Sequence, residues 1–94
     1  MKIIVHRGFG MFSGNDCLVE AWNKTMPKLK VDYGFELSDY RTHPELINLI
    51  EHSEVLAGSL SIVEIPDNVT DWMISDYDGA ESVIYVVEGK LHRA

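Results

Sequence analysis

Apolar and polar residues alternate most regularly in the last third of the chain, where the pattern predicts three β-strands. These strands are expected at Leu60–Ile65, Trp72–Tyr77 and Ser82–Val87. Asp78-Gly79 separates the last two strands, and this dipeptide is typical of two-residue hairpin turns because both residues tolerate positive φ. The region is therefore predicted to form an antiparallel hairpin preceded by one further strand.

The predicted turn also fixes which residues face each other across the hairpin. A short loop at Asp78-Gly79 leaves one register in which aromatic and β-branched side chains lie on the same side of the sheet. Such pairs each contribute about 0.2–1 kcal/mol to stability, whereas like charges in facing positions repel. The expected cross-strand pairs are Ile74 with Val83, Trp72 with Tyr85, and Asp76 with Glu81.

The first third of the chain predicts a buried strand and a helix. A continuous apolar run within Lys2–His6 is typical of a strand that is covered on both faces. The helix is indicated by apolar residues at helical spacing, namely Leu18, Val19, Trp22 and Met26. It is expected to end near Thr25, because Pro27 disfavours helical backbone in the residue before it.

The middle of the chain is expected to hold a short edge strand and a second helix. Between Lys28 and Leu37, apolar residues alternate with lysines that discourage edge-to-edge pairing. Thr42 and Glu45 have the spacing of a capping box, with a hydroxyl and a carboxylate capping the first helical turn. The predicted buried face of this second helix consists of Leu46, Ile47, Leu49, Ile50 and Val55.

The order of these elements predicts the fold class. We expect a small single α+β domain spanning residues 1–94, with two helices packed on one face of a mostly antiparallel four- to five-stranded sheet. The tail Lys90–Ala94 is expected to be frayed. A content of 46% hydrophobic residues argues against disorder, and no apolar run approaches the about 20 residues of a membrane span.

Charge is distributed unevenly along the chain. The formal net charge is −7, and the span from Thr42 to Gly89 contains no Lys or Arg. Direct binding to nucleic acid requires clustered basic residues, so the sequence argues against it. An acidic face favours instead a partner with a basic surface. The simpler interpretation is that the charge only keeps the protein in solution.

Carboxylates gather around the predicted hairpin and the turn before it. The candidate partner-binding residues are Asp67, Asp71, Asp76, Asp78 and Glu81. One interpretation is a solvated polar turn. The other is an acidic contact surface for a basic protein.

A glycine-rich segment follows the first predicted strand and resembles an anion cradle. Its candidate anion-binding residues are Arg7, Gly8, Gly10 and Ser13. Glycines allow close backbone approach, and a following helix N-terminus attracts anions. The segment lacks the endings of the phosphate-binding loop and of the dinucleotide fingerprint, so a structural turn is the alternative interpretation.

Histidine and cysteine do not predict a metal site. His43 and His52 are not four residues apart on one helix, and Cys17 is the single cysteine, which indicates a reducing cytosol. We expect Cys17 to be a small buried hydrophobe and His6 to be a structural histidine. The sequence shows no catalytic set, so no enzymatic activity and no cofactor are expected.

Several segments resemble a family of small phage and prophage proteins of unknown mechanism. The opening segment, residues 2–13, reads as a strand followed by a Gly-Phe-Gly turn that ends in Ser, and similar segments follow in the same order. They are Tyr40–Ile47, Leu60–Val69, Trp72–Gly79 and His92-Arg93. The resemblance implies a phage setting and carries over no catalytic residue. Asn15–Leu37 departs from the family pattern.

Three functional hypotheses follow. The favoured one is a non-enzymatic phage accessory protein that binds and inhibits a host defence or nucleic-acid-handling protein in the cytoplasm through its acidic surface. The second is a protein that sequesters a nucleotide signal, or a small nucleotide-processing enzyme, using the Gly8–Gly14 loop. The third is an interaction subunit whose exposed edge strands mediate a homodimer.

Overall fold

The computed structural model describes residues 1–6, 16–31, 40–77 and 80–94. Its strands are β1 (Lys2–His6), β2 (Leu60–Glu64), β3 (Asp71–Tyr77), β4 (Ala80–Val87) and β5 (Lys90–Arg93). Its helices are α1 (Asp16–Thr25), α2 (Pro44–Glu51) and α3 (Glu54–Ala57), with a short 3₁₀ helix, η1, at Pro27–Leu29. Among the helices in these ranges, none has the length and apolar content needed to cross a bilayer.

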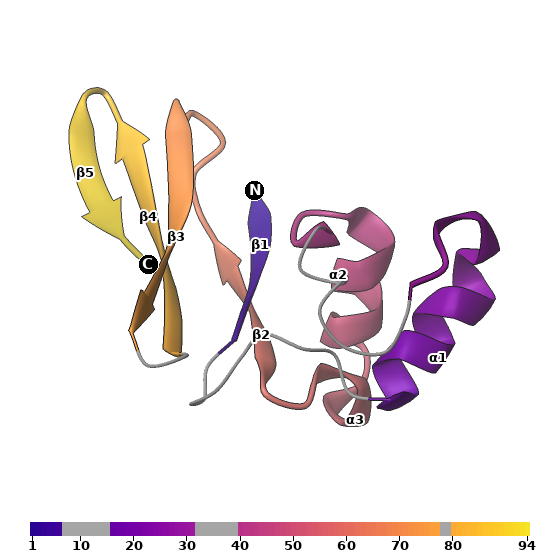
Figure 1. Cartoon of the computed structure of the whole chain (residues 1–94). Coiled ribbons are helices and arrows are strands. Elements are labelled where there is room, and N and C mark those ends of the chain that lie inside the picture. Colours follow the sequence, from indigo (N-terminus) through magenta and orange to yellow (C-terminus); the bar gives the residue numbers. More distant parts are fainter. Residues whose placement is uncertain (7–15, 32–39, 78–79) are drawn as a thin grey trace.

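The elements form three layers, as Figure 1 shows: the helices, the pair β1–β2, and the sheet β3–β4–β5. The predicted α+β class is confirmed, and each strand pair in the described ranges is antiparallel. The arrangement differs from the expected single sheet of four to five strands, because the strands divide into a two-stranded and a three-stranded sheet.

The pair β1–β2 is buried on both faces, as the unbroken apolar run in β1 predicts. One face turns Ile4 and Leu60 toward the helices, where they join a core cluster with Leu18, Trp22 and other buried residues. The opposite face belongs to a second cluster of buried residues, which consists of Ile3, Val5, Val63, Ile65 and Val83. The middle layer therefore holds the helices and the second sheet together.

Arg41 and Glu81 occupy the free edge of β1, and this explains why the sheets stay separate. The N–H of Ile4 donates to the carbonyl of Arg41 at 2.9 Å, and the N–H of His6 donates to a Glu81 carboxylate oxygen at 2.8 Å. Arg41 returns a hydrogen bond from its guanidinium to the carbonyl of Ile4 at 2.9 Å. These edge groups are satisfied by Arg41 and Glu81, so β4 lies beside β1 without pairing with it.

The predicted edge strand after α1 is wrong over its described part. Pro27–Leu29 forms η1, and the remaining residues of that prediction from position 32 on lie outside the described ranges. Side chains of α1 bind this backbone: Trp22 donates to the carbonyl of Leu29, and Asn23 bonds both the N–H and the carbonyl of Val31. Because these groups already have partners, the segment packs on α1.

The start of α2 differs from the predicted capping box by one residue. His43, not Thr42, is the N-cap, and its Nδ1 accepts a hydrogen bond from the N–H of Glu45 at 3.2 Å. The cause is Pro44, which occupies the first helical position and holds the residue before it in extended backbone. The helix then breaks at His52, which resets the helical phase and leaves Val55 exposed rather than buried.

The C-terminal segment is not frayed, and Lys90–Arg93 forms β5 against β4. The turn between them consists of Glu88 and Gly89, whose φ angles are 52° and 77°. Two successive positive φ angles are those of the two-residue turn that joins antiparallel strands. Glu is unusual in this conformation, and for this reason the sequence alone does not point to a hairpin here.

Candidate functional site

The sheet β3–β4–β5 has an inner and an outer face, and the predicted register assigns residues to each. The pairs Ile74–Val83, Trp72–Tyr85 and Asp76–Glu81 are confirmed. The inner face packs on β1–β2, where Trp72, Ile74 and Tyr85 lie against the second core cluster. Since side chains alternate along a strand, the residues between them point outward. The Asp78-Gly79 turn itself lies outside the described ranges.

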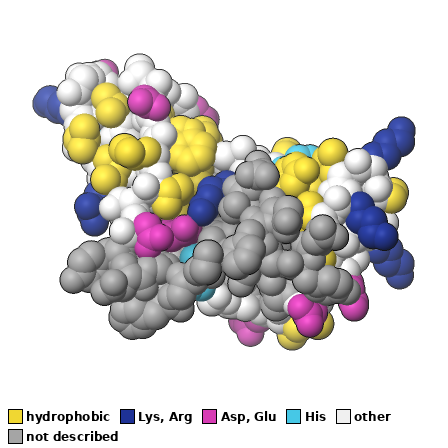
Figure 2. All heavy atoms as spheres, viewed as in Figure 1, with side chains coloured by type: hydrophobic (Ala, Val, Ile, Leu, Met, Phe, Trp, Pro, Cys, Tyr) yellow, Lys and Arg dark blue, Asp and Glu magenta, His cyan; other side chains and the backbone are white. Residues whose placement is uncertain are grey.

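The part of the outer face that spans all three strands consists of two cross-strand rows. One row is Asp71, Val86 and Leu91, and the other is Met73, Ile84 and Arg93. Five of these residues, all except Arg93, line an open hollow of about 250 Å³. Met73 is 61% exposed and Leu91 is 72% exposed. Figure 2 shows hydrophobic side chains at the surface of this end of the molecule.

Sequence reasoning missed this outer face, although a signal is present. Met73, Ile84 and Val86 are apolar at positions that alternate with the inward-facing residues, so β3 and β4 are apolar on both faces. The fourth apolar residue of the surface, Leu91, belongs to β5, in the segment for which the sequence predicts a frayed tail. Without β5 the outward apolar residues look scattered, and with it they form one surface.

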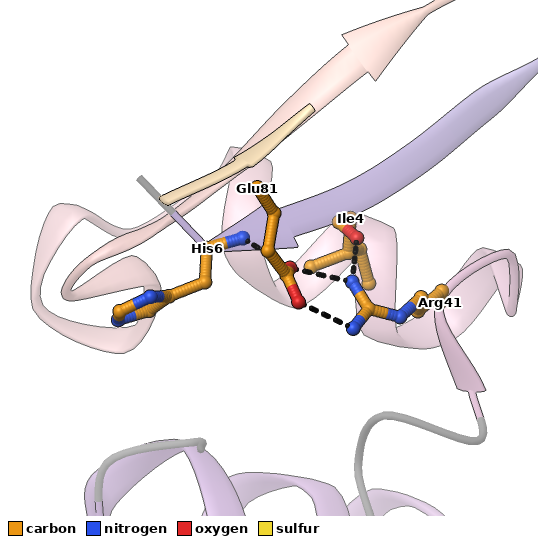
Figure 3. A network of polar contacts seen from close by, with 4 residues as sticks. All are labelled: Ile4, His6, Arg41 and Glu81. Carbon is orange, nitrogen blue, oxygen red and sulfur yellow. Dashed lines mark hydrogen bonds and ion pairs between the residues drawn. The ribbon is translucent and has the colours of Figure 1, made fainter. Parts of the chain in front are cut away.

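Glu81 is a buried structural residue, so it cannot belong to an exposed acidic surface. Its exposed fraction is 7%. Figure 3 shows its carboxylate between the N–H of His6 and the guanidinium of Arg41, while the His6 ring points away. Arg41 donates two hydrogen bonds to it, each 2.8 Å long. This bidentate geometry is the strong form of the Arg–carboxylate pair.

The same network sets the pKa of Glu81. Burial raises its pKa, but the hydrogen bonds from Arg41 and from the N–H of His6, with the attraction of the Arg41 charge, outweigh burial. The net result is a pKa below the ordinary value of 4.5. The folded protein therefore holds this carboxylate in its charged form.

This lowered pKa predicts a pH dependence of stability. A group whose pKa is lower in the folded state stabilises the fold above its unfolded pKa, and the effect is lost as pH falls through the folded value. We expect Glu81→Gln to lower the free energy of unfolding at neutral pH, and the gap from the wild type to narrow below about pH 4.5. Urea denaturation at a series of pH values measures it. A gap that stays constant down to acidic pH would contradict the assigned role.

The other predicted acidic residues do not form one surface. Asp67 binds the terminal ammonium of Met1 at 2.7 Å, a hydrogen bond that lowers its pKa. Asp71 lies on the outer face and Asp76 on the inner side, toward the opposite end of β3. Asp78 lies outside the described ranges. Figure 2 also shows acidic side chains in several separate places on the visible face.

The remaining sequence candidates are placed as follows. Arg7, Gly8, Gly10 and Ser13 lie outside the described ranges. Cys17 is exposed in the first turn of α1 rather than buried, since the buried stripe of that helix consists of Leu18, Val19 and Trp22. Within the described ranges, no three His, Cys, Asp or Glu residues are placed to hold a metal ion.

A second hollow, of about 320 Å³, lies between β1 and the start of α2. Its lining consists of Lys2, Thr42, Pro44, Ile47, Asn48 and Glu51. Lys2 Nζ and Glu51 Oε1 form an ion pair of 2.8 Å there, and this pair raises the pKa of Lys2. Its two charges are already paired with each other, so the hollow offers little electrostatic attraction to a ligand.

Comparisons with models of protein families, with curated proteins and with solved structures found no match. The functional argument therefore depends on the geometry of the chain itself. Of the surfaces in the described ranges, the outer face of β3–β4–β5 combines exposed apolar side chains with charged residues at its margin.

Proposed function

We propose that this protein works by binding another protein, and that the outer face of β3–β4–β5 is its contact surface. The observation that carries the proposal is the exposure of Met73 and Leu91 beside Ile84 and Val86. A contiguous exposed apolar patch rimmed by polar residues marks an interaction site, whereas scattered exposed apolar residues are ordinary. Methionine is also common at contact surfaces that adapt to a partner.

The charged residues at the margin add orientation to this contact. Asp71 and Arg93 are at opposite corners of the outer face, and their charges have opposite sign. Marginal charges steer association and fix the register of two surfaces more than they raise affinity. A partner is therefore expected to meet the face in one orientation.

The biological setting in this proposal is that of a phage accessory protein. The resemblance of the chain to small phage proteins favours a non-enzymatic inhibitor of a host defence or nucleic-acid-handling protein in the host cytoplasm. The net charge of −7 favours a target with a basic surface. Of the predicted acidic set, Asp71 is exposed on the outer face and can meet such a target there, whereas Glu81 is buried and cannot.

Substitutions on the outer face test the proposal. Met73→Glu and Leu91→Glu place a charge at the centre of the apolar contact, so each is expected to reduce retained protein about tenfold or more. The measurement is affinity capture on the immobilised chain. Host lysate, to which untagged copies of the chain have been added, is passed over it, and the retained proteins are quantified by mass spectrometry. Val55→Glu is the matched control, because Val55 is 71% exposed and lies on α3.

The proposal requires a difference between the face variants and the control. Circular dichroism first establishes that all three variants are folded. Two results would refute the outer face as the contact surface. One is that Val55→Glu reduces the amount of retained protein as much as Leu91→Glu does, and the other is that neither Met73→Glu nor Leu91→Glu reduces it.

A further inference from the structure

We propose that the outer face binds a second copy of the chain, forming a symmetric dimer in which Asp71 of each copy meets Arg93 of the other. This inference rests on the proposed function, since it uses the same contact surface, for which a second copy then competes with a host protein. It is carried by the arrangement of charge and exposed apolar groups on that surface.

The six residues of the two rows that span all three strands form a grid on the outer face. The charged residues, Asp71 and Arg93, occupy one diagonal of this grid. The most exposed apolar residues, Met73 and Leu91, occupy the other diagonal. The β4 residues of the two rows, Val86 and Ile84, lie between them at the centre.

This arrangement is self-complementary. When two copies meet face to face about a two-fold axis that runs close to the Met73–Leu91 diagonal, the Asp71 corner of one copy falls opposite the Arg93 corner of the other. The symmetry repeats the pair, so the contact contains two ion pairs around an apolar centre. The strands of the two sheets then cross at a steep angle, as in orthogonal sheet packing.

Neither charge belongs to an ion pair within residues 1–6, 16–31, 40–77 and 80–94 of one copy. In the part of the chain that the structure describes, Arg93 forms no ion pair. Asp71 accepts a hydrogen bond from the N–H of Trp72, the next residue, and is exposed. Both side chains are therefore able to pair across an interface without breaking an existing ion pair.

The size of the face sets the expected strength of the dimer. The three strands have 7, 8 and 4 residues, and at about 3.4 Å per residue and about 4.8 Å between strands they cover roughly 300 Å². A stable interface buries about 800 Å² on each partner. The dimer is therefore expected to be weak, with a dissociation constant in the micromolar range or above.

Charge reversal tests the pairing directly. Sedimentation equilibrium over a range of about 1 μM to 1 mM is expected to show a monomer–dimer equilibrium for the wild type. Asp71→Arg alone, or Arg93→Asp alone, places like charges at both corners and is expected to weaken the dimer about tenfold. An equimolar mixture of these two variants restores opposite charges at both corners, so it is expected to recover the wild-type dimer. Val55→Glu again serves as the control and leaves the dimer unchanged.

The outcomes separate this inference from the proposed function. A chain that remains monomeric at 1 mM, or a mixture of the two charge variants that fails to recover the dimer, overturns the inference. The inference is also overturned if the dimer remains intact in Leu91→Glu and in both charge-reversal variants. In that case the dimer forms through pairing of the strand edges. If the chain is monomeric and Leu91→Glu still abolishes capture of a host protein, the outer face keeps its binding role with a different occupant.

Discussion

Replacing Arg41 with alanine is expected to lower the free energy of unfolding by about 3–5 kcal/mol, because the substitution leaves a buried carboxylate without its charged partner. Glu81 has a side-chain exposed fraction of 6%, and Arg41 supplies two of its hydrogen bonds. Without Arg41, the N–H of His6 still donates to this carboxylate. The same substitution removes a hydrogen bond to the carbonyl of Ile4, so the edge of β1 opens as well.

Urea denaturation followed by circular dichroism measures this loss. A domain of this size has a total stability of about 5–15 kcal/mol, so the loss is a large fraction of it and is expected to lower the urea midpoint clearly. Lys2→Ala is the matched control, since it removes the exposed ion pair with Glu51. Exposed ion pairs contribute little, and this control is expected to leave stability almost unchanged.

A comparison of single and double variants tests the cause. Replacing Arg41 and Glu81 together with leucine and methionine removes the buried charge, and is expected to recover much of what Arg41→Ala loses. Equal losses in Arg41→Ala and Lys2→Ala would contradict the assigned role of the buried pair.

Trp22→Ala is expected to lower the free energy of unfolding by about 3–5 kcal/mol, because it leaves a cavity at the centre of the helix layer. Trp22 has no exposed surface and packs in the first core cluster. Its ring lies 5.1 Å from the ring of Tyr40 and 5.0 Å from that of His43, which places it where α1 meets the start of α2. The substitution also leaves the carbonyl of Leu29 without its indole donor.

Thermal and urea unfolding measure this loss, with the fluorescence of the remaining Trp72 as one probe. Trp22→Phe is a graded control: it keeps a six-membered aromatic ring and removes the five-membered ring with its N–H, so its cost is expected to be smaller than that of Trp22→Ala. Val55→Ala removes exposed apolar atoms and is expected to be near neutral. A Trp22→Ala variant as stable as Val55→Ala would refute the central position of this side chain.

Local patterns in the sequence predict much of this fold. The run Ile3, Ile4 and Val5 indicates a strand buried on both faces, and both core clusters confirm it. The hairpin register follows from a turn dipeptide and from facing aromatic and β-branched residues, and the strand pairing agrees. These features depend on neighbours in sequence, so a local pattern is sufficient to find them.

Features that depend on distant residues were not predictable in the same way. Arg41 and Glu81 are 40 residues apart, and a carboxylate near a turn looks solvated until the fold brings an arginine to it. The split into two sheets depends on these two side chains. β5 was missed for a different reason, because a positive φ at Glu88 has no clear sequence signal.

The candidate site was predictable only in part. Negative charge predicts both Asp71 and Glu81 as contact residues. Asp71 lies on the outer face, whereas Glu81 is buried. Net charge describes the whole chain and does not say which side chains point outward. The apolar outer face becomes visible only when three strands are aligned in register.

The placement of β1 also has a consequence for the order of events during synthesis. β1 is synthesised before both of its partners, because its pairing strand β2 begins at Leu60 and its edge partner Glu81 is 75 residues away from His6. Non-local pairing of this kind slows folding and leaves apolar segments exposed in the meantime. The Ile-Ile-Val segment of β1 therefore has no strand to pair with until β2 has been translated, and its apolar side chains stay exposed during that interval.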